Sequence, residues 1–94
     1  MRDEQPVSDL LKVVFRRLEM TDAVNDFEVK DAYRSIVGDL INKLTWSLRY
    51  ENRVLYVKVA SAALRQELSY KKYDLTKRIN DQLGRNALDN VIFV

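Results

Sequence analysis

A short group of aromatic and basic residues is the part of this sequence best suited to binding chemistry. Tyr70, Tyr73, Lys72 and Lys77 project away from the apolar stripe of a predicted helix, with Arg65 on one flank. Tyrosine is enriched among residues that anchor protein interfaces, and its ring can also stack on an unpaired base while a nearby lysine binds phosphate. We therefore predict a contact surface, for a protein partner first and for nucleic acid second. The alternative is that both rings cover neighbouring side chains or pack in a homodimer.

A second basic group lies near the start of the chain. Lys12, Arg16 and Arg17 share the outer face of a predicted helix, where they could neutralise a few phosphates and give weak, salt-sensitive binding. Acidic residues nearby in the sequence, among them Asp9 and Glu19, reduce the local positive potential. A solvated helix face is therefore the simpler interpretation of these three residues.

The composition excludes the commonest kinds of catalysis. The 94 residues include no His and no Cys, which removes the usual general base, the cysteine nucleophile and the usual metal ligands. Asp74 and Asp81 share a helix face, but seven residues of helix separate them by ~10 Å, which is too far for these two alone to hold a metal ion tightly. We predict no catalytic residue, no cofactor and no metal. An enzyme built on carboxylates, Lys or Tyr alone is the remaining alternative.

The overall composition is typical of one small globular domain. Hydrophobic residues make up 47% of the chain and charged residues 32%, with a net charge of +2, which permits a nucleic-acid partner without requiring one. We predict a flexible arm over residues 1–6 and a single domain over residues 7–94. The sequence shows neither a signal peptide nor an apolar stretch of membrane-spanning length, so we expect a cytoplasmic protein.

The first half of the domain predicts two helices. Apolar residues recur at helical spacing over residues 8–20, after a good N-cap at Ser8. The same spacing continues over residues 21–44, where Thr21 could cap a second helix. Gly38 lies inside this pattern and predicts either a kink or the close approach of another backbone.

A hairpin follows these helices. Polar and apolar residues alternate over residues 45–50 and 55–60, on either side of a turn at Glu51-Asn52-Arg53. Asn52 suits a tight two-residue turn, whereas Arg53 suits one poorly, so a turn wider than two residues is the alternative. Trp46 falls on the apolar face of the first strand, which predicts that its indole lies in the core.

A long helix and a final strand complete the predicted domain. Ser61 can cap a helix over residues 61–83 that Gly84 ends, and residues 88–94 read as a strand. The predicted order is α-α-β-β-α-β, with a three-stranded mixed sheet covered by helices on one face. This arrangement is a small α+β fold.

With these elements in place, the sequence resembles a known family. An ordered set of residues carries the resemblance, rather than any single motif: Asp31-Ala32-Tyr33, Ile36-Val37-Gly38, Val54-Leu55-Tyr56-Val57, Ser61, Leu64, Glu67-Leu68 and Val91-Ile92-Phe93. In this set, which spans about Val7 to Val94, the sequence is similar to the bacterial DciA family. The resemblance implies a KH-like α+β domain that binds the replicative DNA helicase, assists its loading onto single-stranded DNA in replication, and binds DNA weakly.

The resemblance also sets limits on the expected function. The chain resembles a short form of the family that lacks the basic tail of many members. KH modules hold nucleic acid with a Gly-x-x-Gly loop between two helices, whereas the two glycines here, Gly38 and Gly84, are far apart. We therefore expect a helicase-binding protein that uses no small-molecule substrate and no membrane. The alternatives are a stand-alone module for single-stranded nucleic acid and a structural homodimer.

Overall fold

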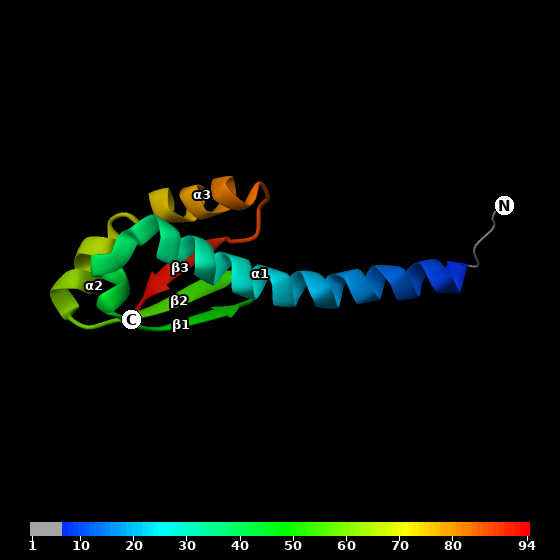
Figure 1. The fold of residues 1–94 in the computed structure, drawn as a ribbon, viewed down its shortest axis with the longest axis horizontal. Coiled ribbons are helices and arrows are strands. Elements are labelled where there is room, and N and C mark those ends of the chain that lie inside the picture. Colours follow the sequence, from blue (N-terminus) through cyan, green and yellow to red (C-terminus); the bar gives the residue numbers. More distant parts are fainter. Residues whose placement is uncertain (1–6) are drawn as a thin grey trace.

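The computed structural model describes the backbone of residues 7–94 and the side chains from residue 23 onward. Within this range the element order is α-β-β-α-α-β, an α+β fold of three helices and one three-stranded sheet (Figure 1). The molecule is elongated and measures 60 × 20 × 19 Å, because the first turns of its first helix project beyond the sheet. The predicted arm over residues 1–6 lies outside the described residues.

The first helix, α1 (Val7–Lys43), runs without a break through Thr21, where a second helix was predicted to begin, and is interrupted only at Gly38. The predicted boundary at Thr21 is wrong, because no Gly or Pro near it interrupts the helical hydrogen bonds. The kink predicted at Gly38 is confirmed, since this residue has φ 84° and ψ 177°, a conformation that only glycine adopts readily. The alternative of a close backbone approach is wrong, because a Cβ atom at Gly38 would meet no atom within 4 Å.

The sheet is mixed, as predicted. Its strands β1 (Thr45–Glu51), β2 (Val54–Val59) and β3 (Asn90–Phe93) lie in the order β1-β2-β3, with β1 antiparallel and β3 parallel to β2. The hairpin turn has only two residues, because Glu51 already pairs with Val54.

That tight turn forces an unusual backbone on Arg53. Asn52 and Arg53 have φ values of 51° and 64°, as a two-residue turn of this kind requires. The Arg53 guanidinium is held across the sheet by Asp89, 3.1 Å from its Nε, and by the carbonyl oxygen of Asn86. We infer that these contacts compensate for the strained backbone at Arg53.

The helix predicted over residues 61–83 is divided into α2 (Ala62–Ser69) and α3 (Lys72–Leu83). Both predicted ends are confirmed: Ser61 Oγ accepts the Leu64 N–H at 3.1 Å, and Gly84 ends α3 in the left-handed conformation. The helix breaks because its two halves pack differently. The first half, α2, contacts the sheet at β2 and β3, whereas α3 also lies along α1, and one straight helix could not reach both positions.

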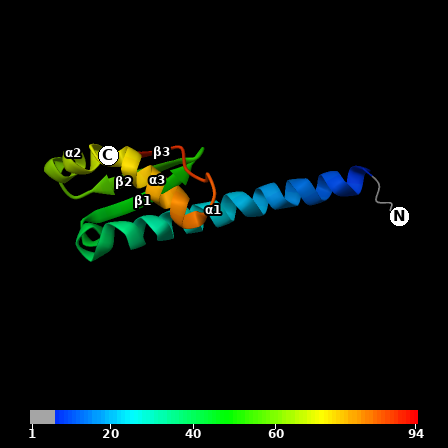
Figure 2. The same ribbon diagram turned by 90° about the horizontal axis from the view of Figure 1, so that it is seen from above.

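The core lies between the sheet and the helices. Figures 1 and 2 show α1 and α3 on the same side of the sheet, as predicted. Fully buried side chains come from each of these layers: Val29 and Tyr33 of α1, Leu55 and Val57 of β2, Ile79 of α3, Leu88, and Val91 of β3. The buried Tyr33 hydroxyl lies 3.0 Å from Thr45 Oγ1, which in turn donates to the carbonyl oxygen of Ile41 at 2.8 Å. Burial raises the pKa of Tyr33 above its usual value.

The prediction that Trp46 lies in the core is wrong, since its side chain is 64% exposed. Thr45 pairs with Val59 and Ser47 with the next residue, Lys58, so Trp46 is an extra residue in a β-bulge. The bulge breaks the alternation on which the prediction depended. As a result, the side chain that points inward to Tyr33 is that of Thr45.

Candidate partner-binding groove

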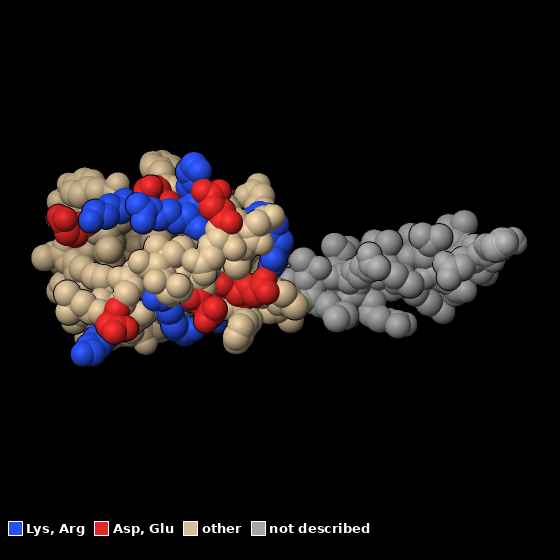
Figure 3. Space-filling view, turned by 45° about the horizontal axis from the view of Figure 1, so that its top comes forward, with Lys and Arg blue, Asp and Glu red and all other residues tan. Residues whose placement is uncertain are grey.

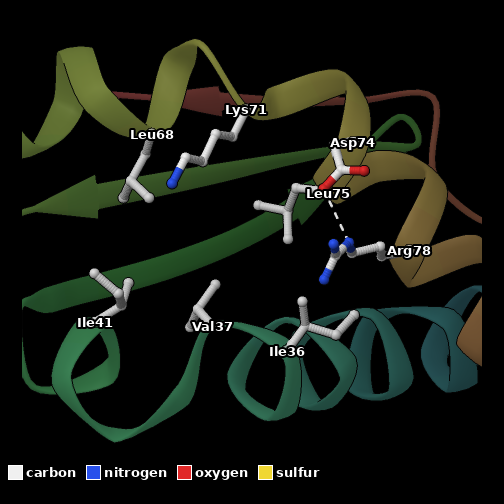
Figure 4. Close-up of a pocket in the computed structure, with 8 residues that line it drawn as sticks. All are labelled: Ile36, Val37, Ile41, Leu68, Lys71, Asp74, Leu75 and Arg78. Atoms are coloured by element: carbon white, nitrogen blue, oxygen red, sulfur yellow. Dashed lines mark ion pairs between the residues drawn. The ribbon is translucent and has the colours of Figure 1, made fainter.

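A groove of about 450 Å³ separates α1 from the junction of α2 and α3 (Figure 4). Side chains from the two sides point toward one another across it, and most of them are aliphatic. The lining residues are Ile36, Val37 and Ile41 from α1, and Leu68, Lys71, Asp74, Leu75 and Arg78 from the α2–α3 side. We call this feature the groove below.

The groove depends on the two interruptions in the helices. On one side, Gly38 kinks α1 between Val37 and Ile41, so that aliphatic side chains before and after the kink face the same space. On the other side, the turn at residues 70–71 separates Leu68 from Leu75. Leu75 is buried in the core, but Ile36, Val37 and Leu68 are only partly buried against it, so they leave an apolar surface open at the groove.

The rim of the groove is charged and mildly basic. Arg78 Nε lies 2.9 Å from Asp74 Oδ2, so these two charges largely neutralise each other. Lys71 is exposed and forms no ion pair with residues 23–94. Figure 3 shows lysine and arginine side chains gathered in a row beside an uncharged stretch of this face. The groove therefore offers an apolar floor with one unpaired cation at its edge.

The two tyrosines predicted for a contact surface lie at the α2–α3 junction. Tyr70 is 74% exposed and Tyr73 is 78% exposed, so neither ring is covered by neighbouring side chains. Gln66 Nε2 donates to the Tyr70 hydroxyl at 3.1 Å, and Lys72 Nζ lies 5.3 Å from the centre of the Tyr73 ring. Tyr70, Lys72 and Tyr73 therefore flank Lys71 in sequence at the α2–α3 junction, where they do not line the groove.

The other predicted site residues are not brought into this cluster. Lys77 is one turn further along α3, where Asp81 Oδ2 lies 2.9 Å from its Nζ and raises the pKa of Lys77. Arg65 is exposed on α2, one turn before its end. The side chains of Lys12, Arg16 and Arg17 lie outside the described residues.

Two comparisons with known proteins give no match, either among curated proteins or among solved structures. The model of the DciA family, described as Dna[CI] antecedent, matches residues 6–93. The chain belongs to the DciA family. This family is connected with helicase loading and is not a family of enzymes. The family resemblance predicted from the sequence is thereby confirmed.

Among residues with described side chains, no three His, Cys, Asp or Glu residues are placed to hold a metal ion. In the same part of the chain, no helix combines the length and the apolarity needed to cross a bilayer. The feature that the fold does present is the groove.

The groove is the part of this DciA domain that sequence reasoning missed. Leu68 and Leu75 are seven residues apart, which matches one uninterrupted apolar stripe, so the sequence predicts both on the same face of a single helix. No Gly or Pro marks the turn between them. The signal that could have pointed to the groove was Gly38, because a kink in α1 changes the direction of the apolar residues that follow it.

Proposed function

We propose that this chain is a non-enzymatic protein of DNA replication that binds the replicative DNA helicase and assists its loading in the cytoplasm. The observation that carries the proposal is the family match, which covers residues 6–93. The groove supports it, since an apolar floor with a polar rim resembles the surfaces on which proteins dock segments of their partners.

The helicase would contact the groove together with the exposed tyrosines of the α2–α3 junction. Tyr70 and Tyr73 hold their polar hydroxyls and their apolar rings in solvent, and residues of this type often dominate the binding energy of an interface. Lys71 forms no ion pair with residues 23–94. An acidic group of the helicase could therefore pair with Lys71 without breaking an existing ion pair. The proposed contact set is therefore Tyr70, Lys71, Tyr73 and the floor of the groove.

The chain would assist loading by selecting one conformation of the helicase. A bound protein shifts a conformational equilibrium only to the extent that it binds one state more tightly than the other. In this proposal the chain binds the loading-competent form of the helicase ring better than the closed form. No covalent step is needed, which agrees with a domain that has no His and no Cys.

The proposal is tested by capture of the purified helicase from the same organism on the immobilised chain. We expect retention at micromolar concentrations, and at least tenfold weaker binding when Lys71→Glu is combined with Tyr70→Ala. Lys58→Glu is the matched control, because Lys58 is also exposed but lies on β2, away from the groove. No retention of the helicase, or equal losses in the double variant and the control, would reject the proposal.

A further inference from the structure

A second, smaller hollow lies where the start of β1 meets α1. It has a volume of about 130 Å³ and shares no residue with the groove. Its lining residues are Arg34 and Asn42 from α1, and Thr45, Trp46, Ser47 and Leu48 from β1. A closed cavity of about 150 Å³ holds one benzene ring, so this smaller hollow takes at most part of a single planar ring, with the rest of the ring outside it.

Trp46 makes this hollow unusual. It is the only Trp of the chain, and the β-bulge leaves its side chain 64% exposed at the rim of the hollow. Large aromatic side chains are normally retained in cores or at interfaces, because their burial from water is strongly favourable. A bulge that holds a tryptophan outside the core indicates a surface that receives another flat apolar group.

The polar groups around the hollow are available for a ligand. Arg34 is exposed and forms no ion pair with residues 23–94. The Asn42 amide donates from Nδ2 to the Arg34 carbonyl oxygen at 2.8 Å, and this bond orients Asn42 Oδ1, which has no hydrogen-bond donor among the described residues. The Thr45 hydroxyl, in contrast, is already engaged with Tyr33 and Ile41. The hollow therefore combines one cation, one oriented acceptor and one aromatic surface.

We propose that this hollow binds one unpaired base of single-stranded DNA. Trp46 stacks on the base, Asn42 Oδ1 accepts a hydrogen bond from its edge, and the Arg34 guanidinium pairs with an adjacent phosphate. A base pair inside a duplex cannot enter a hollow of this size, so the site selects single strands.

This inference goes beyond the proposed function and uses a different surface. Helicase binding is assigned to the groove on the α2–α3 side, whereas the hollow lies at the outer edge of the sheet on β1. Variants of one surface should leave the other intact. Failure of one proposal is therefore distinguishable from failure of the other.

The test uses the intrinsic fluorescence of Trp46, which reports on this hollow alone. Titration with a thymine oligonucleotide of about 15 nucleotides at low salt should quench the fluorescence, and the matching duplex should not. With a labelled oligonucleotide, Trp46→Ala should weaken binding at least about fivefold, the loss expected from one stacked base. Arg34→Ala should also weaken binding and reduce the slope of log K against log salt by about one.

Phe27→Ala is the matched control, because Phe27 is a large aromatic residue that is 69% exposed, against 64% for Trp46, but lies on α1 and lines neither the hollow nor the groove. Its affinity for the oligonucleotide should equal that of the unchanged protein. The inference is overturned by any of four results: no quenching, equal quenching by the duplex, unchanged affinity in Trp46→Ala, or free thymidine monophosphate binding as tightly as the strand. A larger loss of affinity for the oligonucleotide in Tyr73→Ala than in Trp46→Ala would place the site on the tyrosine surface and would also overturn the inference.

Discussion

Arg85 joins the segment after α3 to α1 by binding Asn25, sixty residues earlier in the chain. Its Nε and Nη2 lie 3.0 and 2.6 Å from Asn25 Oδ1, and Nη2 also pairs with Glu28. Asn25 is only 7% exposed, so its amide oxygen depends on this guanidinium for a donor. The contact fixes where α3 ends relative to α1, and these two helices form the two sides of the groove.

Replacing Arg85 by Ala should therefore destabilise the domain. The variant leaves the Asn25 oxygen buried without a donor, for which we expect a loss of about 1–3 kcal/mol in the free energy of unfolding. Urea denaturation measures this loss. Arg65→Ala serves as the control, since Arg65 is exposed and forms no ion pair with residues 23–94. Equal stabilities of the two variants would show that the Arg85–Asn25 contact contributes nothing.

Gly38→Ala should destabilise the domain through backbone strain. At φ 84° and ψ 177° a Cβ atom costs about 1–3 kcal/mol, although the space around it is empty. The variant should either unfold at lower urea or straighten α1, which would move Ile41 away from the groove and weaken partner binding. Ser35→Ala, at an exposed helical position before the kink, should leave stability unchanged or slightly higher. An unaltered urea midpoint in Gly38→Ala, with unaltered partner binding, would contradict this explanation of the kink.

Tyr33 should make stability depend on pH in the alkaline range. Burial raises the pKa of Tyr33 above 10.0, although the hydrogen bond with Thr45 partly opposes that shift. The folded state therefore holds this proton more tightly than the unfolded state, so its contribution is complete below pH 10.0 and falls as pH rises further. Tyr33→Phe, which loses the bond to Thr45, should be less stable by about 1 kcal/mol at neutral pH.

The difference in the free energy of unfolding between the original protein and Tyr33→Phe should narrow as pH rises above 10.0. The other tyrosines and the lysines are present in both proteins, so their titration cancels in this comparison. Urea denaturation of both proteins across this range is the measurement. A difference that stays constant or widens as pH rises would show that the Tyr33 proton is not linked to folding.

Much of the fold could be predicted because local signals agree with the final packing. Ser61 caps α2 and Gly84 ends α3 through their own backbone and side-chain chemistry, which does not depend on distant residues. The alternation of polar and apolar residues likewise predicted the hairpin, and Gly38 predicted the kink. The predictions that were wrong concern features that depend on tertiary packing. Nothing local marks the turn between α2 and α3, and the β-bulge at Trp46 accompanies a contact of Thr45 with Tyr33, twelve residues earlier.

The candidate site could be predicted only in part for the same reason. The exposure of Tyr70 and Tyr73 follows from their position opposite an apolar stripe, which the sequence shows directly. The groove, in contrast, forms where α1 packs near the α2–α3 junction. The helical periodicity within each helix does not show how the helices pack against one another. The hollow at Trp46 is similar, because Arg34 and Trp46 line it from different elements.

Hydrogen–deuterium exchange of the chain, alone and with the replicative helicase of the same organism, tests the central claim most directly. We predict slower exchange at the amides of residues 36–41 and 68–78 in the complex, because the partner covers both sides of the groove. Residues 54–59 of β2 should exchange at the same rate in both samples. Identical exchange along the whole chain at saturating helicase, or protection confined to residues outside the groove, would contradict the account.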